Sequence, residues 1–341
     1  MKQNKLPVLI LLMIMVFTPF LYSLSSKQKT FQWLKSIDAL SSEESIDEIE
    51  ELSIPASEIK AQDLKLLVNV PNLRNLALFS SPMEKKVNVS DQSLKFLLKL
   101  TKLEILSLKY LPISGEALKY LENLKQLKEL NIKWMSIKGN GLRYLTTLKK
   151  LRELSLMVSV KGTRLKYLKK LTNLEILSLS GSSITGKETI YLKNLKKLKA
   201  LNLSLLKIKD EGLKHLKGLT NMLYLDLHAT GISSDGLIHL SQMKNLIGLK
   251  ISGNDRITNE GLSHIIKLNN LKELSLPSKI DDNGLKIIVK LSKLKKLSLE
   301  YNDKITVKGI LFLKKLKHLN ELNLSDTRIT RKEYKRLALL I

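Results

Sequence analysis

The sequence predicts one right-handed α/β solenoid, with a parallel β-sheet on its concave face and short helices on its convex face. Three observations support this fold class. The motif L-x-x-L-x-L occurs twelve times, apolar and polar residues alternate at its core, and a segment with helical spacing follows each copy. Alternation with period two is typical of a strand with one buried face, whereas spacings of three and four residues are typical of a helix. Repeats of this length that combine both elements indicate a solenoid.

The twelve motifs form a regular series. Most neighbouring copies are 24 residues apart, some are 23 or 25 residues apart, and one pair is 30 residues apart. Their second apolar positions are Leu52, Leu76, Leu106, Leu130, Leu154, Leu177, Leu201, Leu225, Leu249, Leu274, Leu297 and Leu322. A single repeat cannot bury its leucines alone, but stacked repeats share one continuous core. We therefore expect one repeat domain over residues 49–341.

Within each repeat the elements follow in a fixed order. The strand contains the L-x-L core, an isoleucine such as Ile208 comes a few residues later, and a turn with glycine leads into a short helix. In this example the helical stretch covers residues 210–216, and Gly212 is expected to ease the start of the helix. The step of 30 residues between Leu76 and Leu106 inserts six residues, which either line a binding face or form a neutral surface loop.

Residues 1–25 have the pattern of a targeting segment. Lys2 and Lys5 precede an apolar run over residues 6–20, and Ser23 and Ser25 offer small residues at positions −3 and −1 of a cleavage site. A cleaved signal peptide is the first interpretation, and an uncleaved N-terminal anchor is the alternative. Both predict an exported protein, which is periplasmic, secreted or anchored on the outer side of a membrane.

Charge and cysteine content limit the function further. The chain has no cysteine, which excludes disulfides, zinc–thiolate sites and a cysteine nucleophile. Its net charge is +26, but residues 41–58 are acidic and contain no Lys or Arg. We expect residues 26–48 to form an N-terminal cap segment that precedes a basic array of repeats.

Residues 49–341 resemble the leucine-rich-repeat superfamily. The segments 208–216 and 257–265 follow I-T/K-x-x-G-L-x-x-L and look most like the ribonuclease-inhibitor-like and F-box-associated subtypes. This chain departs from those relatives because it lacks their cysteines and any F-box-like module upstream. The resemblance implies a curved solenoid whose concave sheet binds proteins or other ligands, as an analogy at the level of the fold.

The strand register predicts which side chains face the concave surface. These are the residues just before, just after and three after each strand leucine. The candidate ligand-binding residues on this face are Phe79, Lys109, Lys133, Trp134, Met157, Tyr224, Asp226 and His228. Exposed aromatic residues and methionines are common interface anchors, although each of them also occurs as an ordinary solvent-exposed residue.

The distribution of charge separates two classes of function. The three concave columns contain four lysines against seven acidic residues, so the excess lysine lies in the helices and descending loops. The favoured function is a non-catalytic scaffold that binds a protein partner on the concave face. The alternative is electrostatic attachment of the basic convex face to an anionic envelope polymer or membrane. Basic and aromatic residues do not interleave on one groove, so nucleic acid is not an expected partner.

No enzyme activity, metal or cofactor is expected. The sequence contains no H-E-x-x-H, glycine-rich phosphate loop or paired catalytic carboxylates, and Asp226 and His228 have no third group. His215, His239 and His264 recur at one helical position, but neighbouring helices are too far apart to share one metal. We expect these rings to pack between helices. The C-terminal helix is expected to fold back over the last repeat and leave a monomer, with a tail-to-tail dimer as the alternative.

Overall fold

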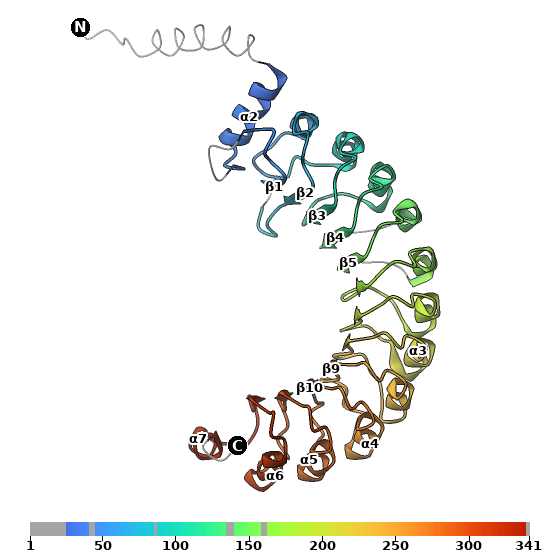
Figure 1. Ribbon diagram of the computed structural model, residues 1–341, viewed down its shortest axis with the longest axis vertical. Helices are drawn as coiled ribbons and strands as arrows, with labels where there is room; N and C mark the ends of the chain where they lie inside the picture. Colours follow the sequence, from blue (N-terminus) through green and yellow to red (C-terminus); the bar gives the residue numbers. More distant parts are fainter. Residues whose placement is uncertain (1–24, 41–44, 85–86, 134–139, 158–161, 339–341) are drawn as a thin grey trace, which may run out of the picture.

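The structure is a computed structural model that describes residues 25–40, 45–84, 87–133, 140–157 and 162–338. Its repeats follow one another along a curved arc, with strands on the inner side and helices on the outer side (Figure 1). Twelve parallel strands form one sheet, and the strands lie in it in the order in which they occur in the sequence. The predicted solenoid with a concave parallel sheet and convex helices is confirmed.

The strands become shorter along the chain. Five strands of five residues come first: β1 (Glu51–Pro55), β2 (Asn75–Phe79), β3 (Ile105–Lys109), β4 (Glu129–Lys133) and β5 (Glu153–Met157). Seven strands of three residues follow: β6 (Ile176–Ser178), β7 (Ala200–Asn202), β8 (Tyr224–Asp226), β9 (Gly248–Lys250), β10 (Glu273–Ser275), β11 (Lys296–Ser298) and β12 (Glu321–Asn323). All twelve predicted leucines pair with one another across the sheet, so the predicted register is confirmed.

The helical segments differ between the two halves of the chain. After the N-terminal helix α2 (Ser26–Ser36), the first six repeats contain 3₁₀ helices: η1 (Ala61–Asn69), η2 (Asp91–Lys99), η3 (Gly115–Leu121), η4 (Gly141–Thr147), η5 (Gly162–Lys170) and η6 (Gly186–Leu192). The later repeats contain α3 (Lys209–Leu216), η7 (Asp235–Leu240), η8 (Asn259–Gly261), α4 (Leu262–Ile265), α5 (Asp282–Ile288), α6 (Val307–Phe312), η9 (Leu313–Lys315) and α7 (Arg331–Ala338). A 3₁₀ helix rises about 2.0 Å per residue against about 1.5 Å for an α-helix, so for the same number of residues a 3₁₀ segment spans a greater length on the convex side.

The glycines before the helices have a different role from the predicted one. A Cβ atom at Gly141 would lie 2.1 Å from the carbonyl oxygen of Gly115 in the preceding repeat. Among the described glycines, those with positive φ are Gly181, Gly231 and Gly253, and Gly141 is not one of them. Close approach of successive repeats, rather than an unusual backbone conformation at the start of the helix, therefore requires glycine at position 141.

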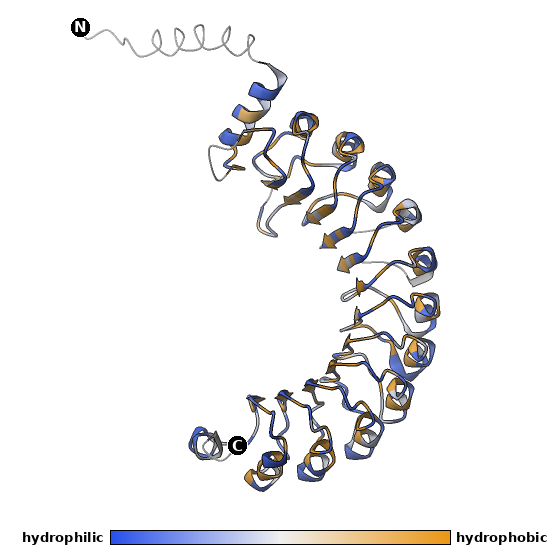
Figure 2. Ribbon diagram, viewed as in Figure 1, coloured by the Kyte–Doolittle hydropathy of each residue, from blue (hydrophilic) through white to orange (hydrophobic). Residues whose placement is uncertain are grey.

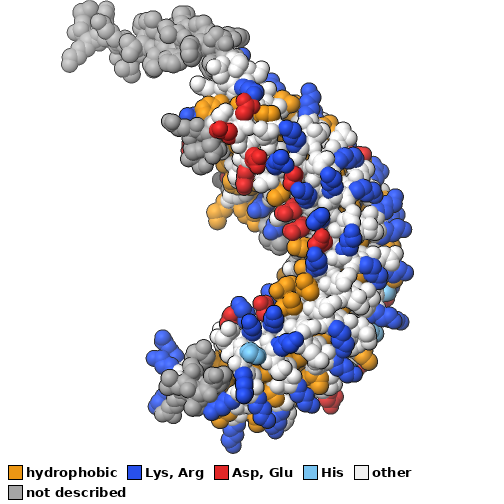
Figure 3. All heavy atoms as spheres, viewed as in Figure 1, with side chains coloured by type: hydrophobic (Ala, Val, Ile, Leu, Met, Phe, Trp, Pro, Cys, Tyr) orange, Lys and Arg blue, Asp and Glu red, His pale blue; other side chains and the backbone are white. Residues whose placement is uncertain are grey.

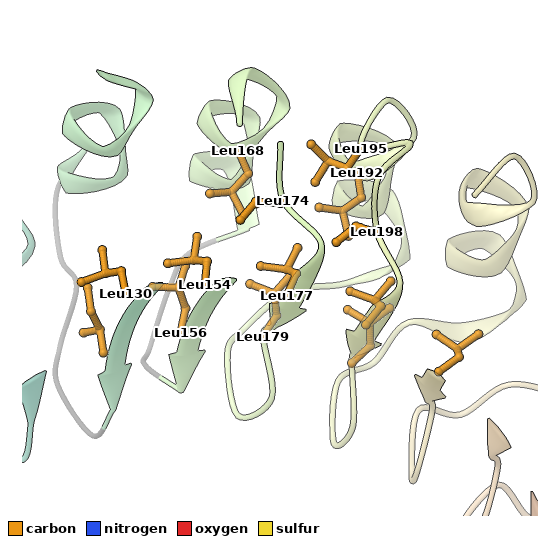
Figure 4. Close-up of a cluster of buried hydrophobic side chains, with 14 of the residues drawn as sticks. Leu130, Leu154, Leu156, Leu168, Leu174, Leu177, Leu179, Leu192, Leu195 and Leu198 are labelled. Carbon is orange, nitrogen blue, oxygen red and sulfur yellow. The ribbon is translucent and has the colours of Figure 1, made fainter. Parts of the chain in front are cut away.

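The core is a continuous stack of aliphatic side chains between the sheet and the helices (Figure 4). Leu130, Leu154 and Leu177 project from successive strands toward the helices and are 1% exposed. Apolar residues occur all along the arc, with hydrophilic residues alternating between them (Figure 2). Because the stack is unbroken, each repeat is stabilised by the repeats on both sides of it.

Polar side chains also lie inside this core, where the strands turn toward the helices. Asn254 is 1% exposed, and its Oδ1 atom accepts hydrogen bonds from the backbone N–H groups of Thr230 (3.0 Å) and Ile232 (3.2 Å). Its Nδ2 atom donates to the carbonyl oxygens of Leu227 (2.8 Å) and Ile251 (2.9 Å). The asparagine therefore joins two neighbouring turns through hydrogen bonds that the backbone does not make by itself.

The two ends of the described solenoid differ. At the N-terminal end, Leu34 of α2 is completely buried, and the side chain of Asn69 donates a hydrogen bond to Thr30 (2.9 Å). Ser25 caps α2 by accepting a hydrogen bond from the backbone N–H of Gln28, so cleavage after Ser25 would remove this cap. At the other end, the strand leucine Leu322 is only partly buried although α7 lies next to α6. The predicted fold-back depends on residues 337–341, whose side chains lie outside the described residues.

Candidate functional site

A cavity of about 520 Å³ lies on the concave side of strands β6–β12. In the middle of its floor, the residues just before the strand leucines of β6 to β9 are Ile176, Ala200, Tyr224 and Gly248, and they pair in register. We call these four residues the apolar row. Ile176 and Tyr224 are 39% and 46% exposed, and hydrophobic side chains gather at the middle of the concave side (Figure 3). In this row Ala200 lies between the two large side chains, so all three form one uncharged stretch of the concave side.

Gly248 provides space for the ring of Tyr224. A Cβ atom at Gly248 would lie 2.6 Å from Cδ1 and 3.1 Å from Cε1 of this ring. A larger residue at position 248 would displace the ring, because real Cβ atoms do not approach other atoms so closely. The glycine therefore lets the aromatic ring lie over the neighbouring strand and widens the flat apolar surface.

Two carboxylates continue this row of the sheet toward the N-terminus. Glu153 pairs with Ile176 on one side and with Glu129 on the other. Among the described residues neither carboxylate has an ion-pair partner within 4.0 Å, whereas Glu104 and Glu175 form ion pairs with Lys128 and Lys199. Partial burial raises the pKa of Glu153, and the charges of Glu129 and Glu175 raise this pKa further. The apolar row is thus bordered by negative charge without a counter-ion.

The raised pKa of Glu153 leads to a prediction about stability. Above this pKa the ionised carboxylate destabilises the folded state, and below the ordinary Glu pKa of about 4.3 it no longer does so. We expect Glu153→Gln to raise the melting temperature slightly at pH 7, with the gain fading as the pH falls through the raised pKa. Melting curves between pH 7 and pH 3 test this, with Glu51→Gln in the same column of β1 as the control. An equal gain at every pH would contradict the prediction.

On the other side of the apolar row the floor is polar and mostly charge-balanced. Lys250 lies 3.7 Å from Asp226, and Lys296 lies 2.7 Å from Glu321. The hydrogen bond and charge of Glu321 raise the pKa of Lys296, so this amine remains positively charged. The apolar row therefore lies between a negative region on β4–β5 and ion-paired strands at the C-terminal end of the cavity.

The structure places the predicted site residues in two groups. Phe79, Lys109, Lys133 and Met157 pair in register at the ends of β2 to β5. Tyr224 and Asp226 line the cavity on β8 and are separated from the first group by β6 and β7. Trp134 lies outside the described residues. The predicted residues are therefore not brought together at a single point.

His228 lies just beyond the end of β8, and its contacts do not form a catalytic triad. Its backbone N–H donates to Asp226 (3.0 Å), while its ring Nδ1 lies 2.9 Å from the hydroxyl of Ser252. In a triad the carboxylate would bind the ring rather than the backbone. The side chain of Asp226 therefore does not orient this imidazole.

One part of the predicted concave surface is wrong. The third residue after the strand leucine faces the concave side in the five-residue strands, where Lys109 and Lys133 are half-buried. After the three-residue strands β6 and β7 the side chain at this position is buried instead, whereas His228 after β8 is exposed. Ser180 and Ser204 are 6% and 8% exposed, and their hydroxyl groups are 3.0 Å apart in a hydrogen bond.

The recurring helical position contains half-buried rings, as predicted. Tyr120, Tyr144 and Tyr191 pack against the core, and the ring Nδ1 of His215 lies 3.0 Å from Thr189 Oγ1. Within the described ranges, no three His, Asp or Glu side chains converge as ligands of a metal ion would. These rings fill the space between neighbouring helices.

The chain resembles solved protein structures but no known family of sequences. No family model matches the sequence, and no curated protein matches it significantly. Solved structures match it well. An internalin, InlF from Listeria monocytogenes, shares 19% identity, and the match covers 91% of this chain and 92% of that chain with a TM-score of 0.62. The chain has the leucine-rich-repeat fold.

Two further leucine-rich-repeat structures resemble it. Internalin C2 from Listeria monocytogenes is 24% identical, and the match covers 72% of this chain and 92% of that chain with a TM-score of 0.51. A chain in the structure of the Rad7–Elc1 complex from yeast is 18% identical, with 99% of this chain and 91% of that chain covered and a TM-score of 0.61. In the described part of this leucine-rich-repeat chain, no helix has the length and apolar character needed to cross a membrane.

Sequence reasoning missed most of the apolar row. It identified Tyr224 as a single exposed aromatic residue but not Ile176, Ala200 or Gly248 beside it. The apolar row could have been found by comparing the residue just before the strand leucine in each repeat. This residue is glutamate in the repeats of β4 and β5 and is uncharged in the next four repeats. In a leucine-rich-repeat sheet these residues lie side by side, about 4.8 Å apart, although they are 24 residues apart in the sequence.

Proposed function

We propose that this chain is a non-catalytic scaffold outside the cytoplasm, and that its concave sheet binds a protein partner. The observation that carries the proposal is the apolar row, in which Ile176 and Tyr224 face solvent inside the cavity. Apolar anchors at the centre of a polar rim are the usual composition of a protein interface. Residues 1–25 act as the export signal or anchor, residues 26–48 as the cap, and residues 49–341 as the binding domain.

Two further observations support a binding function. The leucine-rich-repeat chain from yeast described above occurs in a complex between Rad7 and Elc1, which is an assembly of proteins. Around the apolar row, Asp226 forms an ion pair with Lys250 and accepts from the backbone of His228. These partners hold the carboxylate as part of a polar rim and leave it no role in activating a nucleophile.

The test compares two pairs of exposed apolar residues. Ile176→Ala with Tyr224→Ala removes the centre of the concave surface, whereas Ile238→Ala with Leu311→Ala removes side chains of similar exposure from the convex helices η7 and α6. Tagged variants are used to recover partners from a cell-envelope extract, with quantitative mass spectrometry. Loss of one interface anchor typically costs about 2 kcal/mol, so we expect the concave pair to lower partner recovery at least about thirtyfold.

The convex pair serves as the control and is expected to recover the same proteins as the unchanged chain. Melting curves of both pairs exclude misfolding as the cause of a loss. If the concave pair recovers every specific protein at the unchanged level, the concave binding function is wrong. Loss with the convex pair alone would assign the function to the helices instead.

A further inference from the structure

The parallel sheet gives the solenoid two chemically different lateral edges. Because all twelve strands are parallel, every segment between a helix and the next strand lies on the same edge of the arc, which we call the pre-strand flank. The segments from each strand to its helix lie on the opposite edge, the post-strand flank. Figure 1 shows the arc along its shortest axis, so each flank follows one broad side of a flat crescent.

Positive charge in the C-terminal half is concentrated on the pre-strand flank. Six segments of ten residues, each ending on a strand leucine, form this part of the flank: 192–201, 216–225, 240–249, 265–274, 288–297 and 313–322. They contain fifteen lysines and two acidic residues, Glu273 and Glu321. Both of these carboxylates belong to strands and face the concave cavity.

The rest of these repeats is charge-balanced. Between residues 178 and 312, the strand ends, the post-strand turns and the helices contain ten Lys or Arg and eleven Asp or Glu. The convex helices from η6 to α6 therefore have no net positive charge to attract an anionic partner, whereas η9 and α7 near the C-terminal end are basic. The positive charge is thus concentrated on one flank. Charge that served only solubility could be spread over the whole surface.

Most lysines of this flank have no acidic partner among the described residues. Lys199 and Lys296 form ion pairs with Glu175 and Glu321, and among the described residues no other lysine of the six segments forms one. Several of the remaining amines donate to neutral oxygens. Lys196 donates to the carbonyl of Gly218 (2.9 Å), and Lys293 donates to the side-chain oxygen of Asn270 (2.8 Å). Neutral partners hold the side chains against the flank and leave the field of each charge uncompensated.

We propose that the pre-strand flank of the C-terminal half docks on the surface of a bilayer that contains anionic phospholipid. A flat crescent with lysines from six successive repeats matches a planar array of phosphate groups. The flank offers no stacking platform for nucleotide bases, because the single aromatic residue of the six segments is Tyr224, which faces the cavity. In this orientation the concave sheet stands upright on the membrane and remains open to the partner proposed above, whose binding is a separate property.

The experiment uses two matched sets of four substitutions in the full chain. Lys217→Gln, Lys267→Gln, Lys295→Gln and Lys317→Gln remove four charges from the pre-strand flank. Lys187→Gln, Lys207→Gln, Lys279→Gln and Lys304→Gln remove four charges from the post-strand side of the same half. All eight side chains are exposed, so both sets should fold, and melting curves check this.

Binding is measured by co-sedimentation with phosphatidylcholine vesicles that either contain or lack phosphatidylglycerol. We expect the unchanged chain to bind only the anionic vesicles and to dissociate at high salt. Since each lysine near an anionic surface strengthens binding about fivefold, the loss of four in the pre-strand set should weaken it about six-hundredfold. The post-strand set should bind almost like the unchanged chain, as should Tyr224→Ala.

Three outcomes would overturn the proposal. Equal losses from the two sets would mean that net charge alone drives binding, and no binding to the anionic vesicles would mean that the flank has another role. Tight binding of soluble heparin together with weak vesicle binding would identify a soluble polyanion as the ligand. Because Tyr224→Ala tests the concave face separately, failure of the membrane proposal leaves the protein-binding proposal intact.

Discussion

Leu201→Asp is expected to unfold the repeats around it. Leu201 is 2% exposed and pairs in register with Leu177 and Leu225, so the new carboxylate would be buried between two neighbouring repeats. Burying an unpaired charge and losing the leucine together should cost more than about 4 kcal/mol. Since every repeat depends on its neighbours, the loss spreads along the arc. Circular dichroism melting curves and urea titrations should show a low, broad transition or an unfolded chain.

The matched control is Asn202→Asp in the next position of the same strand. Asn202 is half-buried on the concave side, and its Oδ1 atom accepts a hydrogen bond from the backbone N–H of Ser204 (2.9 Å), which a carboxylate also accepts. The control should melt within a few degrees of the unchanged chain. Ser204 itself is unsuitable as a silent position, because it is buried and bonded to Ser180. Similar melting temperatures for Leu201→Asp and Asn202→Asp would show that the assigned register is wrong.

Asn254→Ala is expected to have the second largest effect. The substitution leaves the buried backbone N–H groups of Thr230 and Ile232 without the acceptor that they share, and it removes the donor to two carbonyl oxygens. An unsatisfied buried donor costs about 1–3 kcal/mol, so we expect the free energy of unfolding to fall by about 3–5 kcal/mol. Equilibrium urea unfolding of the variant and of the unchanged chain measures this difference.

Asn221→Ala provides the comparison. Asn221 is exposed and donates one hydrogen bond, to the carbonyl oxygen of Lys196 (2.9 Å), so its loss should cost less than about 1 kcal/mol. Equal effects of the two alanine substitutions would contradict the special role of Asn254. Hydrogen exchange at the amides of Thr230 and Ile232 should identify the site of the weakening, because these amides lose their acceptor in Asn254→Ala alone.

The leucine register could be predicted because one apolar position recurs at nearly constant spacing and because only stacking buries it. The type of helix could not, since 3₁₀ and α segments of six to nine residues have the same apolar spacing. The role of Gly141 depends on how closely Gly115 of the preceding repeat approaches it, which the local sequence does not reveal. Likewise, Ser204 is buried two residues beyond its strand whereas His228 at the matching position beyond β8 is exposed, and the L-x-L pattern does not distinguish the two.

The candidate site was predicted in part. Tyr224 and Asp226 are residues of the cavity, as their predicted concave position suggested, and Asp226 is held by Lys250 from the next strand. Ile176 was missed because an isoleucine in a strand looks like a core residue unless its column is compared across repeats. The concentration of lysine on one flank was also missed, because it appears only when the residues before and after each strand are assigned to opposite edges.

Because the register of the sheet is unbroken, a distance along the concave face is given by the number of strands that it crosses. Each repeat moves the next side chain of a column by one strand spacing, about 4.8 Å. The separation between the unpaired carboxylate of Glu153 and the amine of Lys296 is therefore set by the number of repeats between β5 and β11. Removing or duplicating one whole repeat would shorten or lengthen this separation by one step while keeping every remaining leucine in place. The number of repeats therefore sets the distance between charged groups on the concave face.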